Sequence, residues 1–174
     1  FRKEQEGFLY PSFDTICGYA AHGAIVHYSA DEKSNIQVKN EGILLVDSGG
    51  QYLQGTTDIT RSIVMGKVTN KMKRDFTLVL KGHLKLMSAV FKDGTRGSSL
   101  DILARGSLWD EFKDFNHGTG HGVGYFLNVH EGPQNISPTP RAAYPFKEGM
   151  ITSNEPGIYL AGEFGIRIEN LILC

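Results

Sequence analysis

The pattern of apolar and polar residues predicts two strands joined by a turn between residues 44 and 61. Apolar, β-branched residues run up to Asp47 and continue again after Asp58, and glycines at 49, 50 and 55 interrupt them. This is the pattern of a hairpin, and each of its strands brings one aspartate into an otherwise apolar setting.

A similar pattern comes earlier in the chain. Residues 15–19 and 24–28 are rich in apolar residues and flank a short turn at 21–23. We therefore expect a second strand pair, with His27 at the end of a buried strand. The polar residues 30–41 are typical of a solvated connecting loop.

After residue 66 the period of the apolar positions changes. From Met72 to Phe91 they recur at steps of three and four, which predicts an amphipathic helix. Thr69 or Asn70 can cap its start, and Gly94 can end it.

A second helix is predicted from Ser98, with Asp101 completing a Ser-x-x-Asp cap-like start. His83 is interpreted as a residue on the face of the first helix. The apolar side of the second helix comprises Leu100, Leu103, Ala104 and Leu108.

The last third of the chain alternates loops and strands. A glycine-rich segment at 115–124 carries two histidines, and a proline-rich loop follows at 133–145. Residues 150–159 and 165–172 are predicted as two strands, each with one glutamate. Alternation puts Arg167 on the same face as the glutamate of the second strand, where it could orient that carboxylate.

Composition limits the classes of protein that need to be considered. With 174 residues, 40% apolar and 21% charged, the chain fits one globular domain with a full core. A net charge of −1 gives no reason to expect nucleic acid or an anionic membrane as partner, and no apolar run is long enough to span a bilayer. The two cysteines, Cys17 and Cys174, have no metal-binding or disulfide spacing, which favours a cytoplasmic setting.

The acidic residues on apolar strands point to metal chemistry. An ionised aspartate at the end of an apolar strand is costly to bury unless a cation or dense hydrogen bonding compensates it. Two divalent cations would balance four such carboxylates, and an oxygen-rich set with one imidazole suits manganese, cobalt, iron or zinc. The candidate ligands are Asp47, Asp58, His121, Glu155 and Glu169.

Six motifs in order give this chain a family resemblance. It resembles the metal-dependent "pita-bread" peptidases of family M24, and within them the cytoplasmic aminopeptidase P (Xaa-Pro aminopeptidase) branch. The motifs are Val46–Gly49, Thr57–Arg61, His117–Gly124, Asn128–Pro133, Asn154–Tyr159 and Ile166–Asn170.

The resemblance implies a role for each candidate ligand. Asp47 would bind one metal ion, Asp58 and Glu169 would bridge two, and His121 with Glu155 would complete the ligand set of the other ion. Manganese is the expected metal, with cobalt, zinc or iron as alternatives. A hydroxide shared by the two ions would attack the substrate carbonyl, and Glu155 would carry its proton to the leaving nitrogen.

Three further histidines have implied roles outside the metal shell. His130 and His27 would contact the scissile carbonyl and the proline side of the substrate, and His117 would line the entrance. Arg61 is interpreted as a structural partner of Asp58. Tyr159 and Tyr125 could line the site or belong to the edge of the core.

The implied fold is α+β, with a curved antiparallel sheet, outer helices and two halves related by a pseudo-twofold. Because the chain lacks an initial methionine and ends inside a predicted strand, we expect residues 1–174 to be a catalytic domain truncated at both ends. N-terminal creatinase-like domains would be absent. The full protein would be a cytoplasmic homodimer, and the piece itself would fold and bind metal but be a weak catalyst.

The expected activity is metal-dependent release of the N-terminal residue from peptides with proline at the second position. A prolidase, which cleaves Xaa-Pro dipeptides, is the alternative within the same chemistry. A metal-free pita-bread binding module is the alternative from another class, and it is disfavoured because all five ligand positions are retained.

Overall fold

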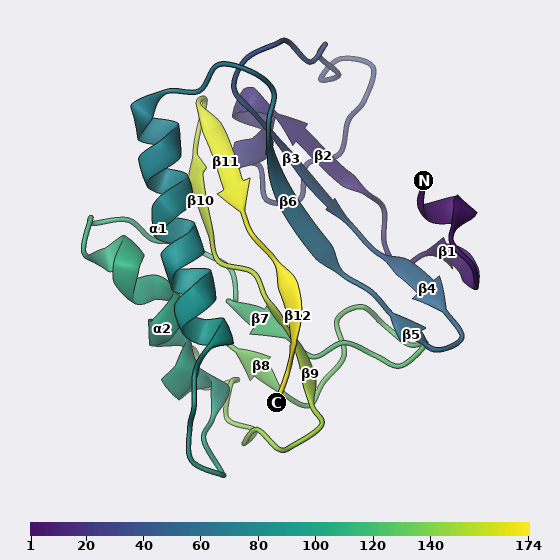
Figure 1. Cartoon of the computed structure of the whole chain (residues 1–174), viewed down its shortest axis with the longest axis vertical. Coiled ribbons are helices and arrows are strands. Elements are labelled where there is room, and N and C mark those ends of the chain that lie inside the picture. The colour runs from purple at the N-terminus through teal and green to yellow at the C-terminus, as the bar shows by residue number, and fades with distance from the viewer.

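Strands and two helices form separate layers in the computed structural model, which describes all 174 residues (Figure 1). The helices α1 (Asn70–Met87) and α2 (Gly97–Trp109) lie on one side of the strands. Two short 3-10 helices, η1 (Arg2–Glu4) and η2 (Ala20–Ala24), lie near the N-terminus. No helix combines the length with the apolar composition needed to cross a bilayer.

The predicted hairpin forms, but both of its strands are interrupted. Central β3 pairs antiparallel with β2 and β6, while β1, β4 and β5 continue the arrangement away from the helices. Asp47 is opposite Thr60 in the register of β3 and β6. Asp58 lies in the break between β5 and β6. The strands are β1 (Phe8–Pro11), β2 (Ile16–Tyr19), β3 (Ile43–Ser48), β4 (Gly50–Tyr52), β5 (Gly55–Thr56) and β6 (Ile59–Val64).

Gly49 explains the first of these breaks. A Cβ at this position would lie 2.0 Å from the carbonyl oxygen of Thr57. Only glycine therefore allows these two segments of the hairpin to approach so closely. The hairpin therefore bends next to Asp47 and Asp58.

The second half of the chain repeats the motif of antiparallel pairs broken at an acid. β10 pairs with β11 and β9 with β12, so each predicted long strand is two short ones. Glu155 lies in one break and Glu169 in the other. The strands are β7 (Gly120–His121), β8 (Asn135–Ile136), β9 (Ile151–Asn154), β10 (Gly157–Leu160), β11 (Phe164–Arg167) and β12 (Asn170–Leu173). A pseudo-twofold relation between the halves stays a prediction.

Helix α1 begins as predicted, because the Thr69 side chain accepts a hydrogen bond from the backbone N–H of Met72 at 3.2 Å. Its predicted end at Gly94 is wrong. The helix ends at Met87, and the chain then turns so that Phe91 packs edge-on against Phe146.

Helix α2 begins within one residue of the predicted Ser98, but the cap-like role of Asp101 is wrong. No side chain caps this helix, and Asp101 is buried, where it accepts hydrogen bonds from Arg105 and Thr119. The helices cross closely at Gly82, where a Cβ would lie 2.1 Å from the carbonyl oxygen of Ala104.

The main core lies between the helices and the strands β3, β10 and β11. A second, smaller cluster lies between the C-terminal half of α1, α2 and β8. Removing this apolar surface from water is the main favourable term in folding. The main cluster contains Ile43, Leu78, Val79, Leu108, Phe115, Ile158, Phe164, Ile166 and Ile168.

The predicted strand 24–28 is wrong. Residues 20–24 form η2, and His27 follows in a turn with an exposed side chain. The physical reason is a contact with β11, since a Cβ on Gly165 would lie 1.7 Å from the carbonyl oxygen of Gly23. Backbone packing against another part of the chain, rather than a strand ladder, sets the conformation here.

Candidate metal centre

A cleft of about 560 Å³ opens between the two halves of the chain. It is lined by every residue that the sequence predicted for the site. These are His27, Asp47, Asp58, His117, His121, His130, Glu155 and Glu169. The structure thus brings these eight side chains together, and their roles as ligands and catalytic groups stay predictions.

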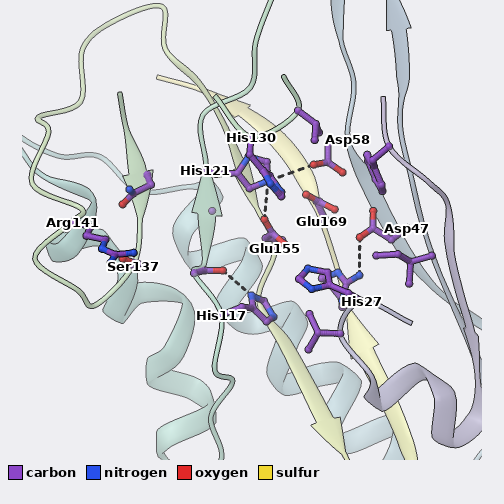
Figure 2. A pocket seen from close by; sticks show the side chains of 18 of the residues that line it. His27, Asp47, Asp58, His117, His121, His130, Ser137, Arg141, Glu155 and Glu169 are labelled. Carbon is purple, nitrogen blue, oxygen red and sulfur yellow. Dashed lines mark hydrogen bonds and ion pairs between the residues drawn. The ribbon is translucent and has the colours of Figure 1, made fainter. Parts of the chain in front are cut away.

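The acidic side chains and His121 point toward one another (Figure 2). One ligand atom each from Asp58, His121 and Glu169 lies within 4.8 Å of the others, which is close enough to hold one ion. His121 Nε2 is 3.4 Å from Asp58 Oδ2 and 3.1 Å from Glu155 Oε1.

Interrupted strands bring the acids to this point. Asp58, Glu155 and Glu169 lie in breaks between consecutive strands, while Asp47 and His121 lie at or near the end of one. At Glu155 the break has a local cause, because Pro156 has no N–H to donate to a strand ladder. In a break, a side chain can leave the strict alternation of faces and turn into the cleft.

Asp47 is held by a buried arginine rather than by solvent. Arg167 Nη2 donates to Asp47 Oδ2 at 2.7 Å, and Arg167 Nη1 donates to the hydroxyl of Tyr159 at 2.8 Å. The Nδ1 atom of His117 faces the carbonyl oxygen of Gly118, so Nε2 accepts from Tyr159 at 2.8 Å. A continuous hydrogen-bonded row thus runs from Asp47 to His117.

This pairing corrects two sequence interpretations. Arg167 orients Asp47, not Glu169, whose Oε2 atom instead accepts a hydrogen bond from Thr60 at 2.7 Å. Arg61 does not pair with Asp58; its guanidinium donates to the backbone carbonyls of Thr60 and Glu169 and to the side chain of Asn170. Contacts between segments that are far apart in the sequence decide both partners, and no local pattern encodes them.

Two buried carboxylate oxygens in the cleft have no hydrogen-bond donor, Asp47 Oδ1 and Glu169 Oε1. Unpaired anionic oxygens in a buried setting are expensive, and a cation is what would compensate them. The donor set of carboxylates plus one imidazole also fits a divalent metal with oxygen and nitrogen ligands. The residues present therefore fit the two-metal site that the sequence predicts.

The pKa values of two candidate ligands reflect their burial and the crowding of negative charge in the cleft. Burial and then the charges of Glu155, Asp58 and Asp47 raise the pKa of Glu169 well above its usual range. Burial also raises the pKa of Asp47, despite the attraction of Arg167. In the absence of a cation, the cluster binds protons to relieve its own repulsion.

The pKa of His121 is also strongly shifted. Burial disfavours its charged form, but hydrogen bonds to Asp58 and Glu155 outweigh burial and raise its pKa to about 10. The reverse holds at Glu155, where the hydrogen bond and charge of His121 overcome burial and lower the pKa. A metal ion would have to displace the proton on Nε2, since only a neutral imidazole binds a metal.

The accessory histidines surround this cluster. The ring of His130 lies 4.2 Å from that of His121, edge to face, and burial lowers the pKa of His130. Burial likewise lowers the pKa of His117. His130 and His117 are therefore neutral at pH 7 and can donate or accept a hydrogen bond, while His27 reaches the cleft from an exposed turn.

The structure also brings in residues that the sequence interpretation missed. Ser137 and Arg141 lie on the proline-rich loop and line the far side of the cleft from the carboxylates (Figure 2). Tyr159 is part of the row described above, whereas Tyr125 lies exposed outside the cleft. Composition gave no signal for Arg141, because the loop that carries it was interpreted only as an exposed connection.

The whole chain matches one known protein family. Residues 1–174 fit the profile of metallopeptidase family M24. The chain belongs to this family. The α+β pita-bread architecture expected from the sequence is thereby confirmed, as close solved structures also indicate.

Curated relatives share about half of their residues with this chain. It is 51% identical over 176 residues to a probable Xaa-Pro aminopeptidase P of Laccaria bicolor, covering 99% of this chain and 27% of that protein. It is 52% identical over 172 residues to aminopeptidase P2 of Arabidopsis thaliana, covering 99% and 24%. The chain thus spans about a quarter of the length of these relatives.

Two solved structures show how similar this fold is to those of known enzymes. The X-prolyl aminopeptidase of Caenorhabditis elegans, described as a cytosolic enzyme with a di-nuclear active site, superposes with a TM-score of 0.93 at 42% identity. That match covers 98% of this chain and 28% of the other. Prolidase from Pyrococcus furiosus superposes with a TM-score of 0.86 at 33% identity, covering 96% and 48%.

Proposed function

We propose that the chain carries the active site of a dinuclear metalloaminopeptidase that releases the N-terminal residue from peptides with proline at the second position. The observation that carries this proposal is the convergence of four carboxylates and His121 in one cleft, with Asp47 Oδ1 and Glu169 Oε1 buried and unpaired. The relatives named Xaa-Pro aminopeptidase support the choice of substrate.

In this proposal each ligand has one task. Asp47 would help to hold one ion, His121 and Glu155 would help to hold the other, and Asp58 and Glu169 would serve both. Divalent ions in such a site lower the pKa of water toward neutrality and polarise a carbonyl. Manganese is the proposed metal, with cobalt, zinc or iron as alternatives.

The protein's own groups position the substrate and move the proton. Ser153 donates a hydrogen bond to Glu155 Oε1 at 2.9 Å, which fixes that carboxylate beside His121. Glu155 receives the proton of the attacking water and passes it to the leaving proline nitrogen. His130 and His27 contact the scissile carbonyl and the proline side of the substrate, and His117 borders the entrance.

Replacing Asp58 with Asn tests this function directly. The variant should lose manganese binding, measured by calorimetry, and hydrolysis of Xaa-Pro peptides, because an amide binds a divalent cation far more weakly than a carboxylate. Asp93→Asn, at an exposed loop position, is the matched control and should behave as wild type. Retained hydrolysis in Asp58→Asn would refute the assignment.

One observation favours a second candidate, a prolidase. Arg141 lines the cleft and has no hydrogen-bond partner that ties it elsewhere, so a free substrate carboxylate could pair with it. A panel of Xaa-Pro dipeptides and longer Xaa-Pro peptides separates the two. Cleavage confined to dipeptides would favour prolidase, and cleavage of the longer peptides favours aminopeptidase P.

For the whole protein, we propose that these residues belong to a catalytic domain in a longer, cytoplasmic, homodimeric enzyme. The shorter span of the chain relative to its relatives, and the cytosolic description of the C. elegans enzyme, support this. A metal-free binding module is disfavoured, because every predicted ligand is present and faces the cleft.

A further inference from the structure

Helix α2 contains a buried ion pair that none of the proposed chemistry uses. Arg105 Nε donates to Asp101 Oδ2 at 2.7 Å, and each side chain is only 3% exposed. Burying two charges is costly unless their remaining donors and acceptors are also satisfied. Here the remaining partners lie in one segment, residues 114–119, which leads directly to His121.

Arg105 binds this segment at three points. Nη1 donates to the side chain of Asp114 and to the carbonyl oxygen of Phe115, both at 2.6 Å, and Nη2 donates to the carbonyl oxygen of His117 at 2.8 Å. The guanidinium also lies 3.9 Å from the centre of the Phe115 ring. Because the guanidinium is a rigid planar fork, these contacts fix both position and direction of the backbone.

Asp101 holds the other end of the segment. Its Oδ1 atom accepts a hydrogen bond from Thr119 Oγ1 at 2.6 Å, and Thr119 is fully buried. The carbonyl oxygen of Thr119 in turn accepts from the backbone N–H of Glu155 at 2.8 Å. One side chain on α2 is thus connected through Thr119 to a proposed metal ligand on the opposite segment.

The step from Thr119 to His121 leaves little freedom. A Cβ on Gly120 would lie 1.9 Å from the carbonyl oxygen of Ser153, so the two segments are in close backbone contact. The backbone N–H of His121 donates to Ser153 Oγ at 2.9 Å, and the same oxygen donates to Glu155. A displacement at Thr119 is therefore passed on to both His121 and Glu155.

We propose that Asp101, Arg105 and Thr119 are positioning residues that set the separation of His121 and Glu155 for metal binding. None of them lines the cleft, so they act only through the residues they hold. The role of these residues in metal binding rests on the proposed function, whereas the hydrogen-bonded geometry that they form does not depend on it.

The test is Thr119→Val, which removes the hydroxyl and keeps the shape of the side chain. Loss of a group that orients a metal ligand typically weakens metal affinity about 10–100-fold. We expect that loss in manganese calorimetry, together with a fall in kcat at nearly constant KM. Thr119→Ser, which restores the donor, should recover most of the affinity.

Two further variants keep the result interpretable. Asp101→Asn retains an acceptor for Thr119 but loses the charge that faces Arg105, and the same loss of affinity is expected. Ser107→Ala is the control, because Ser107 is a buried hydroxyl on the same helix that bonds instead to the carbonyl oxygen of Leu78 at 3.2 Å. It should leave manganese affinity unchanged.

Crystal structures of wild type and Thr119→Val give a readout that does not need metal. Unmoved His121 and Glu155 with wild-type affinity in Thr119→Val would overturn the proposal, as would an equal loss of affinity in Ser107→Ala. If wild type binds no metal but Thr119→Val still displaces residues 117–121, the proposed function fails and the positioning role stands.

Discussion

At the scale of single residues, the cleft is organised by cations of the protein as much as by acids. Arg167 holds one oxygen of Asp47, and Asp47 Oδ1 remains unpaired and buried. Burial still raises the pKa of Asp47, because desolvation exceeds the attraction of the guanidinium. An added metal ion would therefore meet a carboxylate already fixed in one orientation.

Arg141 gives a prediction about recognition of the C-terminal carboxylate of a dipeptide substrate. In Arg141→Gln, kcat/KM for an Xaa-Pro dipeptide should fall about tenfold or more, since a charge-assisted hydrogen bond contributes about 1.5–3 kcal/mol. The same dipeptide with an amidated C-terminus should show little change. Arg74→Gln, at a surface ion pair with Glu111, is the control. Equal losses on both substrates would show that Arg141 does not read a carboxylate.

The candidate ligands were predictable from the sequence because acids on apolar strands have few solvated places to occupy. The partners of those acids were not. Arg61 and Arg167 were assigned by proximity along the chain, whereas the structure pairs Arg61 with the backbone of Glu169 and Arg167 with Asp47. Such pairing depends on which strands become neighbours, and one chain's local pattern does not carry that information.

At the scale of elements, interrupted strands are the recurring feature of the site. The apolar pattern predicted continuous strands at 150–159 and 165–172, and each is broken at its glutamate. Pro156 was a local signal for the first break. The second break had no such signal, because Glu169 is turned inward by its contact with Thr60 from another strand. The ends of helix α1 differ in the same way. The sequence predicts the cap at Thr69, whereas it carries no local signal for the end at Met87.

The crossing of α1 and α2 gives a paired prediction. Gly82→Ala places a Cβ 2.1 Å from the carbonyl oxygen of Ala104 and should lower the free energy of unfolding by about 1–3 kcal/mol. Gly106→Ala, with no atom within 4 Å, should raise it by about 0.5–1 kcal/mol. Urea denaturation measures both. Stabilisation by both substitutions would mean that the helices do not cross at Gly82.

At the scale of the whole molecule, the architecture could be predicted only through the family resemblance. Local patterns gave strands, two helices and a set of acids, but not the contact of Gly23 with Gly165 that replaces a strand with a turn at His27. That contact joins residues far apart in the chain. The charge of the assembled site, by contrast, could be anticipated from the sequence and has a consequence for stability.

We predict that the metal-stripped chain loses stability as pH rises from 7 to 9. The pKa of His121 is about 10 when folded and near 6.5 when unfolded, so its contribution is complete below 6.5 and fades toward 10. Glu169, with its pKa raised by burial and neighbouring charges, acts in the same direction. Because a bound metal ion displaces the proton of His121, the loss should be much smaller with manganese.

Thermal denaturation with chelator and with manganese at both pH values measures this. In chelator, Tm should fall by at least about 2–4 °C, the shift that 1 kcal/mol gives in a chain of this size. Equal pH dependence under the two conditions would contradict the assignment of these groups to a metal site.

The most direct test of the central claim is a crystal structure of the chain grown with manganese, with anomalous scattering measured at the manganese edge. Two anomalous peaks about 3.5–4 Å apart are predicted among the five ligands, the spacing of metal pairs in hydrolytic sites. No peak in the cleft, or a single peak held without Asp47, would contradict a dinuclear centre.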